Sequence, residues 1–380
     1  MKIDNQELFQ WAAAHKDEQL ELLKTLAAIP APSHHEELRV AFIKDWLIKQ
    51  GAEGVTVDEA LNVKLPIACD GRDDITVYMA HTDVVFPDMT PLPVREEDGK
   101  LFAPGVGDDT ANVVGLLMCV KYLLEKKSEA KEPVLIVLNS CEEGLGNLKG
   151  CRAIAERYGK RMERLVSFDG YLLNMVASHA VGSHRSQVTV KTEGGHSFGD
   201  FGNRNAIAVL SNMINALYSV KVPTEGDSKT TYNVGSISGG TSVNTICQEA
   251  TMLYEYRSDN HVCLEKMRQM FEALIAAYRA MGLDIEVELL GERPCAANVD
   301  EAALAELKKL AANSVQRITG SEAKFVSAST DCNIPLSLGI PSVCMGVCVG
   351  SGLHTRGEVL QLNSLPQGSA LCMDFLCNFF

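Results

Sequence analysis

The sequence predicts an α/β protein with a main domain built on a doubly wound, mostly parallel sheet and an inserted α+β domain with an antiparallel sheet and two helices. Two observations support this fold class. Over residues 1–179 and again over 292–380, short apolar runs alternate with helical patterns, which is the order of βαβ units. Over residues 180–291, apolar and polar residues alternate along longer segments, as in half-exposed antiparallel strands. We therefore expect a split main domain, 1–179 with 292–380, and an inserted domain, 180–291.

The main domain is expected to begin with helices and to continue with short strands. Helical patterns cover Leu8–Leu26 and Ser33–Gln50, and Ser33 with Glu36 fits a capping box at the start of the second helix. Pro133–Asn139 is apolar almost throughout, which indicates a strand buried on both faces. The other predicted strands are Gly54–Asp58, Asn62–Ala68, Ile75–Ala80 and Leu165–Phe168, and the other helices are Ala111–Glu125 and Arg152–Tyr158.

Two strand-helix-strand units account for the inserted domain. Its predicted strands are Ser186–Thr192, Tyr232–Ile237, Glu249–Tyr256 and Asp284–Leu289, and its helices are Asn205–Tyr218 and Leu264–Met281. After Asn298 the first pattern resumes. The predicted helices there are Glu301–Ala312, Asp331–Leu338 and Pro366–Phe380, with strands at Ala323–Ser327 and Ser342–Met345.

Composition and charge exclude several classes of function. The net charge of −14 over 380 residues, with no Lys/Arg-rich run, disfavours binding to nucleic acid or to an anionic membrane. The longest apolar run, Ile340–Leu353, is shorter than the roughly 20 residues of a membrane-spanning helix, and the first ten residues lack a signal-peptide core. Several of the twelve cysteines lie in apolar stretches, which favours reduced, buried thiols. We expect a cytoplasmic protein.

Histidine and acidic residues follow the predicted strands or precede the helix after a strand. In α/β sheets, ligands bind at the edge formed by the carboxyl ends of the strands. Taken singly, each of these residues is more often a hydrogen-bonded structural residue or a solvated residue at a helix start than a metal ligand. The whole set supplies the nitrogen and oxygen ligands that zinc favours, although manganese or cobalt could fill the same positions. The set consists of His81, Asp83, Asp108, Asp109, Glu142, Glu143, Asp169 and His354.

These residues lie in motifs that resemble a known family, the dinuclear zinc exopeptidases and deacylases. It includes peptidase T, carboxypeptidase G, acetylornithine deacetylase, succinyl-diaminopimelate desuccinylase and aminoacylase. The match covers nearly the whole chain, in the family's order. The matching motifs are HTDVV at 81–85, GDD at 107–109, CEEG at 141–144, GGHS at 194–197, GGTSVN at 239–244, YR at 256–257 and GLHT at 352–355.

The resemblance implies a role for each matched residue of the metal motifs. His81 and Asp169 would bind one zinc ion, Glu143 and His354 the other, and Asp108 would bridge both. A hydroxide between the two ions would attack the substrate's carbonyl. Asp83 would orient the His81 ring. Glu142 would act as the general base and pass the proton to the leaving amine.

The resemblance also makes the inserted domain a lid and dimerisation domain, so a homodimer is expected. His196 would stabilise the oxyanion, and in dimeric relatives the neighbouring subunit contributes this residue. Asn244, Arg257 and Gly352 are candidates for binding the substrate. The residues alone leave other interpretations open, because Asn244 could cap a turn and Arg257 could pair with Glu255 or Asp259.

The chain departs from the family's pattern at three places. Thr110 and Ala111 follow the bridging turn, where many members carry Lys. Asp169 stands where the deacylase branch tends to have Glu, which tilts the prediction toward peptides. The run at 355–358 lacks the common proline, so substrate contacts from this loop are unspecified.

The expected function is therefore zinc-dependent cleavage of amide bonds in small peptides, by an aminopeptidase or a dipeptidase. The alternative on the same site is an N-acyl amino acid amidohydrolase or a carboxypeptidase, with Arg257 holding a carboxylate. A silent binding protein would be favoured by loss of the base or of a ligand, and this chain has lost neither. Cys141 as a nucleophile with a histidine partner ranks lowest, because nothing nearby in the sequence would lower its pKa.

Overall fold

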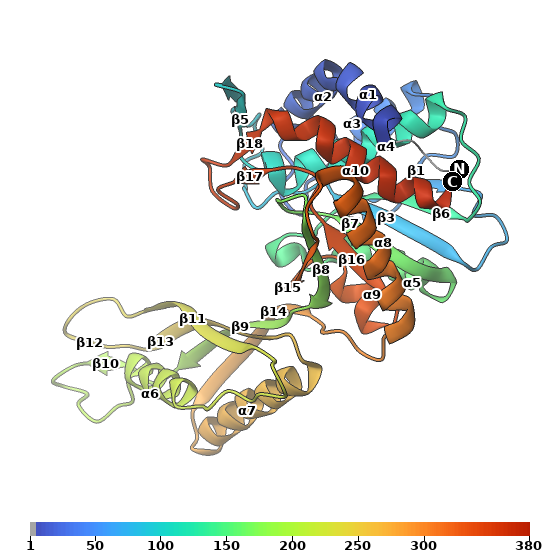
Figure 1. Ribbon diagram of the computed structural model, residues 1–380. Helices are drawn as coiled ribbons and strands as arrows, with labels where there is room; N and C mark the ends of the chain where they lie inside the picture. The colour runs from blue at the N-terminus through green and yellow to red at the C-terminus, as the bar shows by residue number, and fades with distance from the viewer. Residues whose placement is uncertain (1–4) are drawn as a thin grey trace. The chain divides into compact units, whose positions relative to one another are not determined.

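The computed structural model describes residues 5–380 and divides the chain into two compact units. The first unit consists of the chain up to Ala180 together with Ala297–Phe380, and the second is Val181–Ala296 (Figure 1). The second unit ends later than residue 291 because its last strand, β14 (Asp284–Arg293), stays paired with β9 (Gly182–Lys191) as far as Arg293. Within residues 5–380, no helix is long and apolar enough to cross a membrane.

The first unit is built on a mixed sheet with the strand order β1-β2-β6-β3-β7-β16-β8-β15. The central pairs β6/β3, β3/β7 and β7/β16 are parallel, as is β8/β15, while β1/β2, β2/β6 and β16/β8 are antiparallel. The expected mostly parallel sheet is thus confirmed. The strands are β1 Thr56–Val57, β2 Val63–Ile67, β3 Ile75–His81, β6 Val134–Asn139, β7 Met162–Phe168, β8 Met175–Ala180, β15 Lys324–Ala328 and β16 Ser342–Met345.

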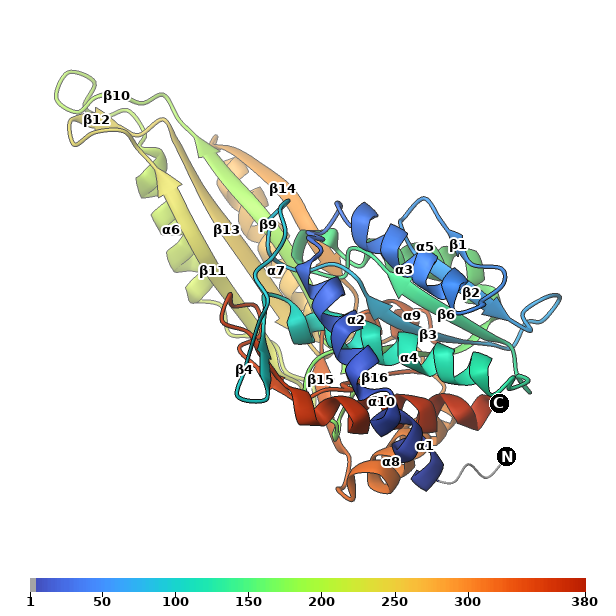
Figure 2. The same ribbon diagram turned by 90° about the horizontal axis from the view of Figure 1, so that it is seen from above.

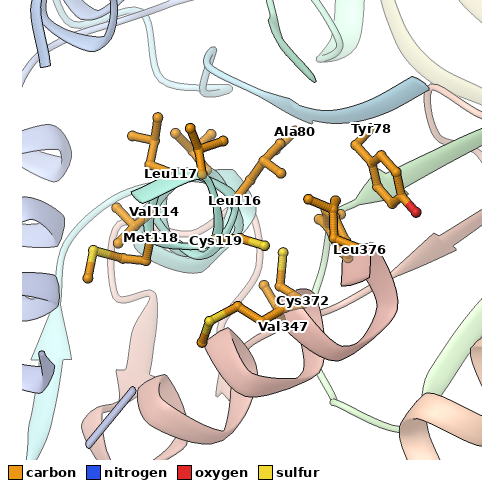
Figure 3. Close-up of a cluster of buried hydrophobic side chains, with 14 of the residues drawn as sticks. Tyr78, Ala80, Val114, Leu116, Leu117, Met118, Cys119, Val347, Cys372 and Leu376 are labelled. Atoms are coloured by element: carbon orange, nitrogen blue, oxygen red, sulfur yellow. The ribbon is translucent and has the colours of Figure 1, made fainter. Parts of the chain in front are cut away.

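The central strands are buried on both faces, since every residue of β3 and of β6 is buried. This explains why β6 reads as a continuous apolar run. On one face, Leu116 and Cys119 of α4 and Cys372 and Leu376 of α10 pack in the same apolar cluster as Tyr78 of β3 (Figure 3). Figure 2 shows α4 and α10 running beside the sheet. The helices of this unit are α1 Asn5–Ala14, α2 Lys16–Ala28, α3 Glu37–Lys49, α4 Asn112–Glu125, α5 Lys149–Tyr158, α8 Glu301–Thr319, α9 Asn333–Ser337 and α10 Leu365–Leu376.

A small antiparallel sheet, with the order β17-β18-β5-β4, also belongs to the first unit. Asp98 and Gly99 both have positive φ and join β4 to β5, as expected for an Asp-Gly hairpin turn. The sequence pattern does not reveal this sheet, because its strands are very short. They are β4 Arg95–Glu97, β5 Lys100–Phe102, β17 Gly350–Ser351 and β18 Val359–Gln361.

The second unit is an antiparallel sheet with the order β11-β13-β9-β14, with the helices α6 and α7 packed on it. The prediction of an antiparallel sheet with two helices is confirmed. Asn205 and Asn260 cap the two helices by accepting hydrogen bonds from the backbone of the first turn. A short pair, β10/β12, lies in the loops that join these elements. The remaining bounds are β10 Gly195–His196, α6 Ala206–Tyr218, β11 Thr230–Gly239, β12 Thr245–Ile246, β13 Glu249–Ser258 and α7 His261–Ala280.

Two local predictions near the N-terminus are wrong. The helix expected over Leu8–Leu26 is broken at His15, whose Nδ1 lies 2.8 Å from the carbonyl oxygen of Trp11. The capping box of Ser33 and Glu36 does not form. Ser33 Oγ instead donates to Asp83 Oδ2 at 2.7 Å, and Glu36 Oε1 accepts from the backbone N–H of Cys141 at 2.9 Å. Both side chains are used in long-range contacts, so α3 begins later than expected, at Glu37.

Candidate metal centre

Three neighbouring parallel strands bring acidic residues and a histidine to one edge of the main sheet. His81 is the last residue of β3, Asp169 directly follows β7, and Glu142 and Glu143 come shortly after β6. Because β6, β3 and β7 are parallel neighbours, their carboxyl ends meet at the same edge. The sheet thus gathers residues that are spread over almost ninety positions of the sequence.

Asp108 and His354 reach this edge from outside the main sheet. Asp108 lies in the irregular helical turn Val106–Ala111, which leads into α4, and the Asp108–Asp109 peptide bond is cis. His354 lies in the loop between β17 and β18. Asp108 Oδ1 is 3.1 Å from His81 Nε2, and Asp108 Oδ2 is 3.1 Å from His354 Nε2. One carboxylate therefore faces two histidines, each with a different oxygen.

These side chains form two overlapping groups of ligand atoms that share Asp108. One group contains His81, Asp108, Asp109 and Asp169, the other Asp108, Glu143 and His354, and within each group the atoms lie within 4.8 Å of one another. A third grouping joins His81 to Glu142 and Glu143. Such nitrogen and oxygen donors suit divalent cations. Glu143 Oε1 is buried without a hydrogen-bond donor in good geometry, although His354 Nε2 lies 3.2 Å away, so the donor set fits two metal ions.

Burial and mutual charge shift the pKa values of these groups. Burial lowers the pKa of His81, but the carboxylates of Asp109, Asp108 and Asp83 outweigh it and raise that pKa well above the usual value. The carboxylates of Asp108 and then Glu143, which face His354 Nε2, raise the pKa of His354 to about 10. Burial raises the pKa of Glu143 to about 7. Burial and the charge of Asp108 raise the pKa of Asp169 well above its usual value.

Asp83 connects the histidine of β3 with the two glutamates after β6. It is fully buried, and its Oδ1 lies 3.3 Å from His81 Nδ1. Its two oxygens also accept the backbone N–H groups of Glu142 at 2.9 Å and of Glu143 at 3.0 Å. Burial opposes ionisation of Asp83, yet the contacts with His81 lower its pKa. One buried carboxylate thus contacts the His81 ring and the backbone of both glutamates.

Several supporting residues were not assigned a role from the sequence. Asp109 accepts the backbone N–H of His81 at 2.9 Å. Arg39 is fully buried and donates to the carbonyl oxygens of Thr82 at 2.9 Å and Ile29 at 2.7 Å, and to Thr110 Oγ1 at 3.3 Å. Thr110, where many family members carry Lys, also donates to Gly105 O at 2.6 Å. Only Asp109 lay in a matched motif, and nothing in the local sequence marks Arg39.

Glu358 is another buried carboxylate that the sequence analysis did not single out. It accepts the backbone N–H groups of Gly105 at 2.9 Å, Gly107 at 2.8 Å and Asp108 at 3.0 Å, and the hydroxyl of Tyr171 donates to it. It stands four residues after His354, at the end of the run 355–358 that lacks the family's common proline.

The Cys141 thiol lies 3.4 Å from His34 Nδ1, but its other contact does not suit a nucleophile. Its thiol donates to Glu36 Oε1 at 3.2 Å. Burial, followed by the nearby charge of Glu36, raises the pKa of Cys141 to about 12. A thiol that stays protonated is a poor nucleophile, so the geometry disfavours this alternative.

The second unit holds three of the remaining predicted residues, His196, Asn244 and Arg257. His196 is exposed at the β10/β12 pair, and its Nδ1 faces the backbone N–H groups of Phe198 and Gly199, both at 3.2 Å. A nitrogen that accepts from two N–H groups is unprotonated, so the proton of the neutral ring is on Nε2. Asn244 is adjacent, since its carbonyl oxygen accepts from Ser197 N at 2.9 Å.

Arg257 and Gly352 have more ordinary surroundings. Arg257 makes a two-pronged pair with Glu255 of its own strand, Nε to Oε1 and Nη2 to Oε2, both at 3.1 Å. This is one of the two pairings that the sequence left open. Gly352, in the first unit, is exposed with φ of +84° and accepts from Thr355 N at 3.0 Å, so it begins the turn that contains His354.

Comparison with known proteins decides the family. Residues 77–378 match the model of the peptidase family M20/M25/M40. The chain belongs to this family. Together with the buried cluster of histidine and acidic residues, this membership makes it a metal-dependent hydrolase, with a donor set for two metal ions.

Three similar proteins illustrate the range of the M20 family. An uncharacterised Bacillus subtilis protein, YqjE, is 27% identical over 77% of this chain and 78% of its own length. A succinyl-diaminopimelate desuccinylase of Paraburkholderia xenovorans is 22% identical over 68% of each chain. The crystal structure of a tripeptidase from Staphylococcus aureus superposes with a TM-score of 0.76 over 95% of this chain and 97% of that one, at 20% identity. This last likeness shows a common fold.

Proposed function

We propose that this M20 protein is a two-zinc exopeptidase that cleaves short peptides, as an aminopeptidase or a dipeptidase. One observation carries the proposal: Asp108 lies 3.1 Å from a histidine on either side, each facing a different carboxylate oxygen. This is the arrangement that a carboxylate shared by two metal ions requires. Aspartate rather than glutamate at position 169 favours peptides over acylated amino acids.

The ligands divide into two sets in this proposal. His81 and Asp169 hold one ion, Glu143 and His354 hold the other, and Asp108 binds both. Zinc is proposed because it takes mixed histidine and carboxylate ligands, although manganese or cobalt would use the same atoms. When bound there, two such cations would polarise the substrate's carbonyl and lower the pKa of a water molecule.

The protein's own residues then move the proton. Glu142 takes a proton from the attacking water and delivers it to the amine that leaves. Glu142 is buried, and one of its carboxylate oxygens lies within 4.8 Å of ligand atoms of His81 and Glu143. Asp83 keeps the His81 ring in place through the 3.3 Å contact with Nδ1 and also holds the backbone of Glu142.

The second unit is proposed to be the lid and dimerisation domain. With its proton on Nε2, His196 can donate a hydrogen bond to the oxyanion, either in its own subunit or in that of a partner. Asn244 and Gly352 are proposed to contact the substrate. Arg257 would have to exchange Glu255 for a substrate carboxylate. A homodimer through this unit and a cytoplasmic location complete the proposal, and twelve free, buried cysteines are in keeping with a reducing compartment.

A second candidate is an N-acyl amino acid amidohydrolase or a carboxypeptidase. The similarity to a desuccinylase over 68% of the chain favours it. In that case the substrate carries a free carboxylate and a blocked amine. Arg257 would then bind the carboxylate.

The test uses Glu142→Ala and a pair of substrates. The variant should lose peptide hydrolysis by about 100-fold or more while binding as many zinc ions as the wild type, because the base supplies 10²–10⁴-fold. Full activity in Glu142→Ala would refute the mechanism. Comparing free with N-acetylated dipeptides separates the two candidates, because equal cleavage of blocked peptides excludes an aminopeptidase.

A further inference from the structure

Glu358 connects the loops that carry three of the proposed metal ligands. It stands in the same loop as His354, four residues further along. Its carboxylate accepts from the backbone of Asp108 and from Tyr171, which comes two residues after Asp169. A single side chain thus joins the His354, Asp108 and Asp169 loops without being a metal ligand itself.

The contacts require a carboxylate at this position. Oε2 accepts from Gly105 N, while Oε1 accepts from Gly107 N, Asp108 N and the Tyr171 hydroxyl. Both oxygens are therefore acceptors only. A carboxamide would turn its NH₂ group toward at least one backbone N–H whichever way it rotated. Glu358 is only 1% exposed, so water cannot take over a lost contact, and an unsatisfied buried N–H is costly.

The same contacts fix the turn from which Asp108 projects. The Tyr171 ring packs directly on Gly107, where an added methyl group would lie 1.9 Å from Tyr171 Cε1. The ring also packs on Gly350 of β17, where a methyl group would lie 2.6 Å from Cε1. The Tyr171 ring therefore packs against the turn at Gly107, while the Glu358 carboxylate accepts hydrogen bonds from the N–H groups of the same turn. Asp108 then has little freedom to move away from the midpoint between the two histidines.

We propose that Glu358 is a positioning residue that keeps the Asp108 carboxylate shared between the two metal sites, and so determines how tightly the second metal ion binds. The inference rests on the proposed two-metal function. Without Glu358, Asp108 can rotate and serve one ion fully while the other loses a ligand. Groups that orient metal ligands typically change metal affinity by about 10–100-fold.

The experiment measures stepwise metal binding, independently of activity. Full-length protein is stripped with a chelator and titrated with Zn²⁺ against a competing chromophoric chelator. Glu358→Gln should weaken the second ion by about 10–100-fold and the first by only a few-fold. Tyr171→Phe removes one donor of four and should weaken the second ion less. Glu97→Gln is the matched control. Glu97 is an exposed carboxylate of β4, in the small sheet next to Glu358, and its replacement should leave both affinities unchanged.

The outcomes separate this inference from the proposed function. If the wild type binds fewer than two ions, the two-metal function fails, and this inference with it. If the wild type binds two ions and Glu358→Gln binds both with unchanged affinity, only the role of Glu358 is refuted, even if the variant melts at a lower temperature. If Glu358→Gln does not fold, Tyr171→Phe decides, since an unchanged second affinity in that variant overturns the proposal.

Discussion

Replacing Arg39 with methionine should strongly lower the free energy of unfolding of the first unit. Arg39 is a buried cation on which the charges of three carboxylates act. Burial lowers its pKa to about 10, against the opposing charges of Asp83, Glu36 and Asp109. The side chain also satisfies the carbonyl oxygens of Thr82 and Ile29, so methionine removes both the charge and the hydrogen bonds at similar volume.

The expected loss follows from what is left behind in the protein interior. Removing this buried cation should cost about 3–5 kcal/mol, because the charges of the three carboxylates stay desolvated and uncompensated. Urea denaturation of Arg39→Met, followed by tryptophan fluorescence, measures this loss, since both tryptophans, Trp11 and Trp46, lie in the first unit.

A second variant and the pH dependence provide controls. Arg39→Lys keeps the charge but not the two-pronged geometry, and it should lose less stability. The cost of Arg39→Met should shrink in acid. The pKa of Asp83 is low, and protonation below it removes the charge that Arg39 compensates. A loss of stability below about 1 kcal/mol at neutral pH would refute the reasoning, because the contacts of Arg39 would then be no stronger than those of surface charges.

Two further predictions follow from the pKa shifts at the site. Because the pKa of His354 is raised to about 10, its imidazole carries a proton at neutral pH that a metal ion must displace, so metal affinity should rise with pH. Calorimetric titration in buffers of different ionisation enthalpy should detect the released protons, and their absence would contradict the His354 assignment. Cys141→Ser should keep peptide hydrolysis within about threefold, because a thiol with a pKa of about 12 cannot serve as a thiolate nucleophile; a loss as large as that of Glu142→Ala would revive the cysteine alternative.

The gathering of His81, Glu142, Glu143 and Asp169 could be predicted because it depends on strand order, whereas Asp108 and His354 reach the edge from outside the main sheet. Parallel strands place their carboxyl ends together, so the residues after β3, β6 and β7 were expected at one edge before any contact was known. The antiparallel sheet of the second unit was likewise readable from its alternating pattern. Its two helices begin after Asn205 and Asn260, residues whose side chains are typical helix caps.

The supporting network could not be predicted, because its partners lie far apart in the chain. Glu358 and Gly107 are separated by 251 residues, and Arg39 and Thr110 by 71. No local pattern distinguishes such a carboxylate from a solvated one. Ser33 and Glu36 even matched a local motif, yet the contacts with Asp83 and Cys141 replaced the expected cap. Tertiary contacts outweighed local preference at that helix start.

The position of β16 in the main sheet has a consequence for how this protein is made. β16 (Ser342–Met345) lies between β7 and β8, both of which are synthesised before the second unit, and His354 follows it. A chain that has left the ribosome only as far as Ala296 has neither the strand that joins β7 to β8 nor the second histidine beside Asp108. The first unit must therefore wait for its C-terminal segment before its sheet is continuous. Its proposed metal ligands are complete only after the loop that carries His354 has been made, so a chain that stops before that loop lacks one of them.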